Sequence, residues 1–170
     1  DKKHILKYLD PSVEFIDITD DFACFGIFGP KSRSLLTEIF GDNFSNDDFK
    51  FGSCKKIIRN NIEMWFQRIS YVGELGWEIY IPIDQSKQIY EKIVSVEKKY
   101  GLVHAGAHSM DILRMEKGFL HWGHDISPAE NPFEAGLSFA IKLNKNEDFI
   151  GKEYLIKNKN IGKKRFLMFI

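Results

Sequence analysis

The spacing of apolar side chains predicts regular structure along most of the first 120 residues. Runs rich in aromatic and β-branched residues predict four strands, over residues 22–28, 54–59, 62–72 and 77–83. Apolar positions at helical spacing predict four helices, over residues 30–40, 84–100, 105–117 and 151–157. Asn60-Asn61 tolerates the left-handed backbone of a tight hairpin between the second and third strands.

Residues typical of helix ends and turns lie at the expected boundaries of these elements. Pro30 suits the first position of a helix, Gly41 suits its end, and Asp84 is expected to cap the second helix, which ends at Gly101. Polar, turn-rich residues predict a loop over 42–52. The elements predict an α+β class with a mixed, largely antiparallel sheet on which helices pack.

The second half of the chain is less regular. Residues 121–136 carry two prolines and are expected to form a loop, followed by a short strand over 135–142. Residues 165–170 form a strongly apolar strand pattern with nothing after it. Such a strand needs partners, so we expect the chain to be a fragment of a longer protein.

Composition and charge narrow the functional classes. Twenty-four basic residues balance twenty-four acidic ones, and no segment collects a large like charge. The chain therefore lacks the clustered positive charge that binding to nucleic acid or an anionic membrane would need. No apolar run is long enough to cross a bilayer. Cys24 and Cys54 lack metal-site or redox spacing, so we interpret them as small buried thiols in the reducing cytosol or an organelle matrix, with a single bridge left open.

The segment from Arg68 to Tyr80 is the strongest candidate for a binding site. Strand alternation places Glu78 and Tyr80 on one face and Trp77 and Ile79 on the other, while Tyr71 lies near the same Gly-x-x-Gly turn. Pattern alone favours an ordinary hairpin with Glu78 in water. The apolar neighbours argue against that interpretation, because a carboxylate among them needs hydrogen-bond donors.

Three other groups of residues have simpler interpretations. Asp111 and Arg114 are three apart on a predicted helix and are expected to form a structural ion pair. His121-x-x-His124 is a weak zinc signal without cysteines or a helical His-Glu-x-x-His pattern, so no metal is predicted. Phe139 is interpreted either as a core residue or as one wall of a ligand slot.

Five motifs in order resemble the aminomethyltransferase (glycine-cleavage T-protein) superfamily, and most closely the folate domains of dimethylglycine and sarcosine dehydrogenases. They are Ile-Ser-Tyr-Val-Gly-Glu-Leu-Gly-Trp-Glu, Leu-Arg-Met-Glu-Lys-Gly, His-Trp-Gly-His-Asp, Asn-Pro-Phe-Glu-Ala-Gly-Leu and Phe-Ile-Gly-Lys-Glu. The resemblance implies a cloverleaf fold around a channel for tetrahydrofolate. It implies that residues 1–162 are the central part of this domain and that 163–170 begin a truncated C-terminal barrel.

The resemblance also implies which residues bind the folate. Tyr71 and Glu78 match pterin-pocket residues, Ile79 and Tyr80 lie beside them, and Phe139 matches an aromatic residue that is usually Tyr in the dehydrogenases. The family's catalytic Asp would precede residue 1, so no catalytic residue is assigned, and FAD would belong only to an additional N-terminal domain. The isolated chain is expected to be inactive.

One departure from the family favours the dehydrogenase-like branch. Met110 stands where glycine-cleavage T-proteins have a cofactor-binding Arg. The resemblance thus implies folate-dependent one-carbon transfer from glycine, sarcosine or dimethylglycine. A non-catalytic folate-binding accessory domain and a purely structural domain remain alternatives.

Overall fold

A computed structural model describes residues 1–159 and 164–168. The chain divides into two compact units, Asp1–Met110 and Asp111–Ile170. Each unit has its own internal contacts, and each is described here by itself. None of the helices in the described ranges is long and apolar enough to span a membrane.

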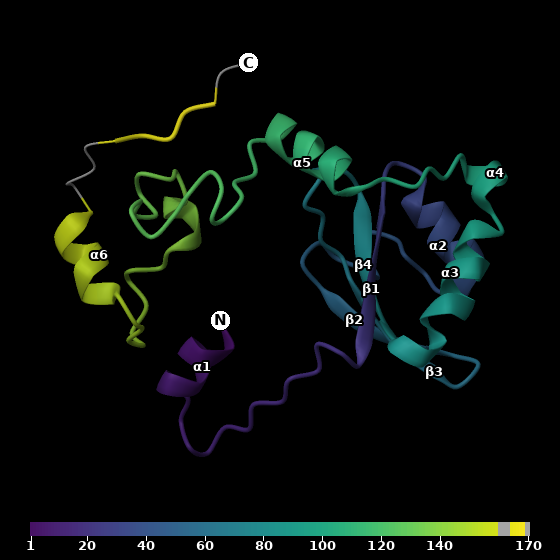
Figure 1. The fold of residues 1–170 in the computed structure, drawn as a ribbon, viewed down its shortest axis with the longest axis horizontal. Helices are drawn as coiled ribbons and strands as arrows, with labels where there is room; N and C mark the ends of the chain where they lie inside the picture. The colour runs from purple at the N-terminus through teal and green to yellow at the C-terminus, as the bar shows by residue number, and fades with distance from the viewer. Residues whose placement is uncertain (160–163, 169–170) are drawn as a thin grey trace. The chain divides into compact units, whose positions relative to one another are not determined.

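Unit 1 is built on a four-stranded antiparallel sheet with strand order β1-β4-β3-β2 (Figure 1). The strands are β1 (Phe22–Phe28), β2 (Cys54–Arg59), β3 (Ile62–Gln67) and β4 (Gly76–Pro82). The helical segments are α1 (Lys2–Tyr8), α2 (Ser32–Phe40), η1 (Ile83–Gln85), α3 (Ser86–Val94) and α4 (Glu97–Tyr100). The antiparallel sheet and its helices confirm the predicted α+β class.

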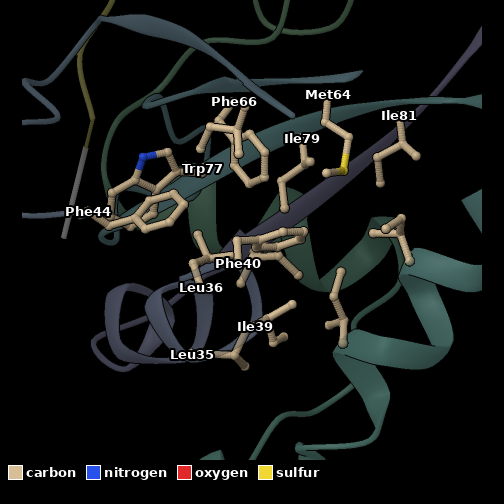
Figure 2. Close-up of a cluster of buried hydrophobic side chains, with 14 of the residues drawn as sticks. Leu35, Leu36, Ile39, Phe40, Phe44, Met64, Phe66, Trp77, Ile79 and Ile81 are labelled. Atoms are coloured by element: carbon tan, nitrogen blue, oxygen red, sulfur yellow. The ribbon is translucent and has the colours of Figure 1, made fainter. Parts of the chain in front are cut away.

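One face of this sheet packs against α2 and α3 to form the hydrophobic core (Figures 1 and 2). Period-2 alternation sends every second side chain of β3 and β4 to this face, and helical spacing supplies the opposing residues. The fully or almost fully buried members include Leu35, Leu36, Phe40, Phe44, Met64, Phe66, Trp77, Ile79, Ile81 and Ile93.

The strand predictions for unit 1 are confirmed except at the ends of the last two strands. The fourth strand was expected over 77–83, but β4 covers Gly76–Pro82 and Ile83 begins η1. The third strand was expected to run to residue 72, but β3 ends at Gln67. Arg68 instead exchanges backbone hydrogen bonds with the 52–53 turn, and Gly73 takes a positive φ of 70°. Residues 69–72, Ile-Ser-Tyr-Val, resemble a strand in sequence although they form a loop. Asn60 and Asn61 both have positive φ, as the hairpin prediction requires.

The helix predictions are confirmed in position but not in detail. The first helix begins at Ser32 instead of Pro30, and the single helix expected over 84–100 is divided into η1, α3 and α4. Asp84 does not cap a helix, because it lies within η1, where its carboxylate accepts a hydrogen bond from Gln85. Gly41 and Gly101 end their helices in the left-handed conformation, as predicted.

Unit 2 contains little regular structure. Helix α5 (Ala107–Glu116) continues into it from unit 1, and η2 (Ser138–Ala140) and α6 (Lys152–Asn158) follow. The predicted strand over 135–142 is wrong, because Gly136 has a φ of 75° and the next residues close a 3₁₀ turn. The strand expected at 165–170 is absent over 164–168, and its last two residues lie outside the described ranges.

The two cysteines are free and exposed, so the prediction that they are buried is wrong. Cys24 is on β1 and Cys54 is on β2, at opposite edges of the sheet. Three strand spacings separate them by about 14 Å, much more than the roughly 6 Å between the Cα atoms of a disulfide. The open alternative of a single bridge is therefore excluded.

We predict that Ile79→Ala lowers the free energy of unfolding by about 2–5 kcal/mol, because the side chain is fully buried and its loss leaves a cavity. Ile58→Ala is the matched control: Ile58 is 53% exposed, and its truncation is expected to cost about 0.5 kcal/mol or less. Urea unfolding measures both values. Equal losses for the two variants would contradict this assignment of the core.

Candidate functional site

The candidate site occupies the sheet face opposite α2 and α3. Alternation along β4 buries Trp77, Ile79 and Ile81 in the core and turns Glu78 and Tyr80 to the other face, where both are half-buried. We call this surface the Glu78 face, defined by Cys24, Gly26, Phe28, Trp65, Gln67, Glu78 and Tyr80. The predicted division of β4 into two faces is thereby confirmed.

Strand register determines the neighbours of Glu78. Gly26 of β1 and Gln67 of β3 are its cross-strand partners. Tyr80 is likewise flanked by Cys24 and Trp65. The acid therefore lies in the middle of the sheet, between a position without a side chain and a neutral amide.

Two glycines make room for an aromatic ring on this face. A Cβ atom at Gly26 would lie 2.4 Å from the Phe28 ring, and one at Gly76 would lie 2.3 Å from it. The Phe28 ring therefore lies over both glycines, beside the strand position that faces Glu78. Trp65, 38% exposed, provides a second aromatic surface beyond Tyr80.

The carboxylate of Glu78 is held by a neighbour on its own strand. The Tyr80 hydroxyl donates a hydrogen bond of 2.8 Å to Oε2 of Glu78. Partial burial and this bond to a carboxylate raise the pKa of Tyr80 well above its usual value. Tyr80 therefore remains a neutral donor at physiological pH and fixes one carboxylate oxygen.

Cys24 belongs to the same group of polar side chains. Desolvation by the surrounding side chains and the nearby Glu78 charge raise the pKa of its thiol, and hydrogen bonding with Tyr80 opposes part of that shift. A raised pKa keeps the thiol protonated, and a protonated thiol is a poor nucleophile. Cys24 therefore contributes an uncharged thiol to the Glu78 face.

The other predicted site residues have different placements. Tyr71 is half-buried in the loop between β3 and β4, so it is not on a strand beside Glu78; that register position belongs to Gln67. The side chain of Ile79 is in the core, which leaves only its backbone for the ligand. Phe139 belongs to unit 2, where it lies in η2 and is 82% exposed.

Sequence reasoning missed two arginines that pack around the reverse side of the site strand. The Arg33 and Arg68 guanidinium carbons lie 5.4 and 5.7 Å from the Trp77 ring, a cation–π arrangement. Arg68 Nη1 also donates to the Phe49 carbonyl at 2.5 Å. Isolated arginines at these positions look like surface residues, so the sequence carried no signal for this packing.

The loop that carries Tyr71 is tied to the start of α2. The Leu75 carbonyl accepts hydrogen bonds from the Gly29 amide at 2.7 Å and from the Ser32 hydroxyl at 3.1 Å. Ser32 is buried, and this bond satisfies its hydroxyl. The β1–α2 turn therefore fixes the position at which β4 begins.

In unit 2, the predicted ion pair is confirmed and is larger than expected. Arg114 is 1% exposed, and its Nε donates to Asp111 at 2.7 Å. Its Nη1 group donates to the Asp125 carboxylate and to the Phe119 carbonyl. These contacts connect α5 to the 119–125 loop, as a structural network should.

The two loop histidines do not form a metal site within the described ranges. His121 and His124 stack with their ring centroids 5.8 Å apart, and His124 lies next to Asp125. Among the residues whose placement is described, no three His, Cys, Asp or Glu side chains are grouped to hold an ion.

Comparison with known proteins places this chain in one family. The sequence profile described as the GCVT N-terminal domain matches residues 1–145. The crystal structure of glycine cleavage system aminomethyltransferase T from Bartonella henselae superposes with a TM-score of 0.71, at 24% identity, over 83% of this chain and 37% of that one. The shared fold defines an aminomethyltransferase-like domain. The chain belongs to the GCVT N-terminal domain family.

Its sequence is also similar to two mitochondrial dehydrogenases. Mouse dimethylglycine dehydrogenase is 41% identical over 92% of this chain, and human sarcosine dehydrogenase is 36% identical over 91%. The chain spans only 18% and 17% of the lengths of these relatives.

We predict that Tyr80 titrates at a higher pH than an ordinary tyrosine and that Glu78→Gln lowers its pKa, because the carboxylate no longer favours the neutral phenol. A tyrosine pKa raised by folding stabilises the protein below the unfolded pKa and loses that contribution as pH rises through the folded pKa. Tyr80→Phe should therefore reduce the alkaline loss of stability above about pH 10. Ultraviolet absorbance of tyrosinate in wild type, Tyr80→Phe and Tyr90→Phe identifies the group; an unchanged titration in Tyr80→Phe would contradict the assignment.

Proposed function

We propose that this chain is the tetrahydrofolate-binding part of an enzyme that transfers a one-carbon unit from glycine, sarcosine or a dimethylglycine-type amine. The observation that carries the proposal is the half-buried Glu78 carboxylate, oriented by Tyr80 on a ring-bearing sheet face. Membership of the GCVT N-terminal domain family and similarity to dimethylglycine and sarcosine dehydrogenases support it.

The chemistry of the Glu78 face suits a pterin. The edge of a pterin presents adjacent N–H donors, and a carboxylate can accept two of them, as it does from an arginine fork. Tyr80 uses one lone pair of Oε2 and leaves Oε1 and the remaining lone pairs for the ligand. Phe28 and Trp65 offer aromatic surfaces suited to the flat faces of a bicyclic ring.

The proposed role of this chain is binding and positioning. Tetrahydrofolate supplies nitrogens that accept the one-carbon unit. The residues described here would orient the pterin and exclude water from one side of it, which accelerates transfer by proximity and protects a reactive carbon. No residue of the Glu78 face is proposed as a catalytic acid or base.

The wider assignments are proposals of the same kind. FAD-dependent oxidation of the amine would belong to another part of the parent protein, as the dehydrogenase names of the relatives suggest. The names of both relatives include a mitochondrial location. We propose the mitochondrial matrix for a eukaryotic parent and the cytoplasm otherwise, with no nucleic-acid or membrane partner.

A second candidate is a non-catalytic folate-binding accessory domain. Met110, 40% exposed, occupies the position at which glycine-cleavage T-proteins were expected to carry Arg. It separates this chain from those transferases but does not decide between a dehydrogenase-like enzyme and an accessory domain. Amine-dependent formation of methylene-tetrahydrofolate by the intact protein separates the two candidates. Folate binding without that product would favour the accessory role.

We predict that Glu78→Gln weakens tetrahydrofolate binding by about 1–3 kcal/mol, the range for a hydrogen bond to a charged group. Glu63→Gln is the matched control, since Glu63 is on the same sheet face but is exposed and pairs with Lys56 at 2.7 Å. Calorimetric titration of the intact protein measures both affinities. An affinity unchanged by Glu78→Gln would remove this residue from the site.

A further inference from the structure

Three nitrogen atoms at the Trp77 side chain in unit 1 are buried donors without an acceptor. They are Nε1 of Trp77, Nη1 of Arg33 and Nε of Arg68, and none has a hydrogen-bond partner in the part of the chain that the structure describes. Figure 2 shows the indole at one end of the labelled core cluster, with its nitrogen on the side away from Leu36 and Ile39. Buried donors are rarely left unsatisfied in folded proteins, so three in one place indicate an acceptor that the chain does not supply.

The same place holds two positive charges without a counter-charge. The guanidinium carbons of Arg33 and Arg68 lie 5.4 and 5.7 Å from the centroid of the Trp77 ring. Burial and the neighbouring Arg68 charge lower the pKa of Arg33. Across residues 1–159 and 164–168, neither arginine forms an ion pair with a carboxylate. An anion beside both groups would offset their mutual repulsion.

Neutral oxygen atoms accept the hydrogen bonds that the two arginines do form. Nη2 of Arg33 donates to Oδ1 of Asn46 at 2.8 Å, and Nη1 of Arg68 donates to the Phe49 carbonyl at 2.5 Å. The carboxylate of Asp48, in the same loop, accepts its hydrogen bonds from other residues of that loop. These contacts hold both guanidinium groups in place but leave their charges uncompensated.

Stacking on the indole is the simplest alternative role for both arginines, and it provides part of their attraction to this position. A ring face is a weaker acceptor than an oxygen atom, however. The indole N–H also lies in the plane of its own ring, so stacking leaves this donor unsatisfied. The unsatisfied N–H of Trp77 is therefore the observation that favours a ligand over a simple arginine stack.

The surroundings of these donors restrict the kind of ligand. The three nitrogen atoms are closed to solvent, whereas Arg33 and Arg68 as whole side chains are only half-buried. Movement of one long arginine side chain would therefore admit a small ion but not a bulky molecule. Guanidinium N–H groups match the oxygen atoms of carboxylates and phosphates in spacing and charge. The ligand that fits best is a small oxyanion.

We propose that Arg33, Arg68 and the indole N–H of Trp77 bind a small oxyanion such as formate or inorganic phosphate. The bound ion would connect α2, the residue after β3 and the start of β4, which are the segments that carry the three donors. The site lies on the core side of β4, opposite the Glu78 face, and it does not rest on the proposed function.

The three tryptophans of the chain allow an internal comparison in a proton–nitrogen correlation spectrum of the 170-residue protein. Formate and inorganic phosphate are titrated in separate experiments, with chloride replaced at constant ionic strength. The Trp77 indole signal should move and saturate with at least one of the two anions. The signals of Trp65 and Trp122, which are 38% and 63% exposed, should not saturate with it. Trp65→Phe and Trp122→Phe assign the three signals.

The arginine variants test the proposed ligands of the ion. Arg33→Gln and Arg68→Gln should each weaken the saturating anion by about tenfold or more, because each removes a charged hydrogen-bond donor. Arg59→Gln is the matched control, since Arg59 belongs to the same unit but already pairs with Asp42, and its titration should match the wild type. The other resonances of each spectrum verify that the variant is folded.

Two results would overturn the site. A wild-type Trp77 signal that responds to neither anion, or that responds equally to chloride, would show that water alone satisfies the donors. A saturating response that persists unchanged in both single arginine variants would place the ion elsewhere. Because the first result is read from the wild type, the proposal remains testable even if a variant does not fold.

Discussion

The structure of unit 1 depends on the burial of alternate side chains along β4. Trp77, Ile79 and Ile81 have no solvent-accessible surface, and their burial against α2 and α3 provides much of the core. Side chains of a strand alternate with period two. Burial of Trp77, Ile79 and Ile81 therefore places Glu78 and Tyr80 on the opposite face of the sheet. The hydrophobic effect on the buried face therefore orients the polar site on the other face.

Packing around Trp77 shows how the core and the site are connected. Phe44 and Phe49 contact its ring edge-on, at centroid distances of 5.4 and 5.9 Å, and Arg33 and Arg68 lie over the indole. These groups come from three separate segments of the chain: α2, the loop between α2 and β2, and the residue after β3. Holding Trp77 from several sides fixes the backbone position of the next residue, Glu78, which a precise hydrogen-bonding site requires.

Local pattern predicted the elements of unit 1 well, because its sheet buries one face and its strands alternate clearly. The pattern-based prediction failed at two segments that resemble strands but do not pair: residues 69–72 form a loop, and the segment after Gly136 forms a turn. The partnership of Glu78 with Tyr80 followed from alternation. The ring of Phe28 over two glycines did not, since it depends on side-chain direction across strands, which a single sequence does not encode locally.

The alternation of side chains between the two faces of β4 also determines where this domain can change length during evolution. Adding or removing one residue within β4 would exchange the two sets of side chains, placing a carboxylate in the core and an indole in water. A compensating bulge would be needed for any such variant to fold. The Asn60-Asn61 hairpin lies at the far end of β3 from the turn into β4, so insertions there leave the β4 register untouched, and length variation among descendants of this chain is expected to accumulate at that tip.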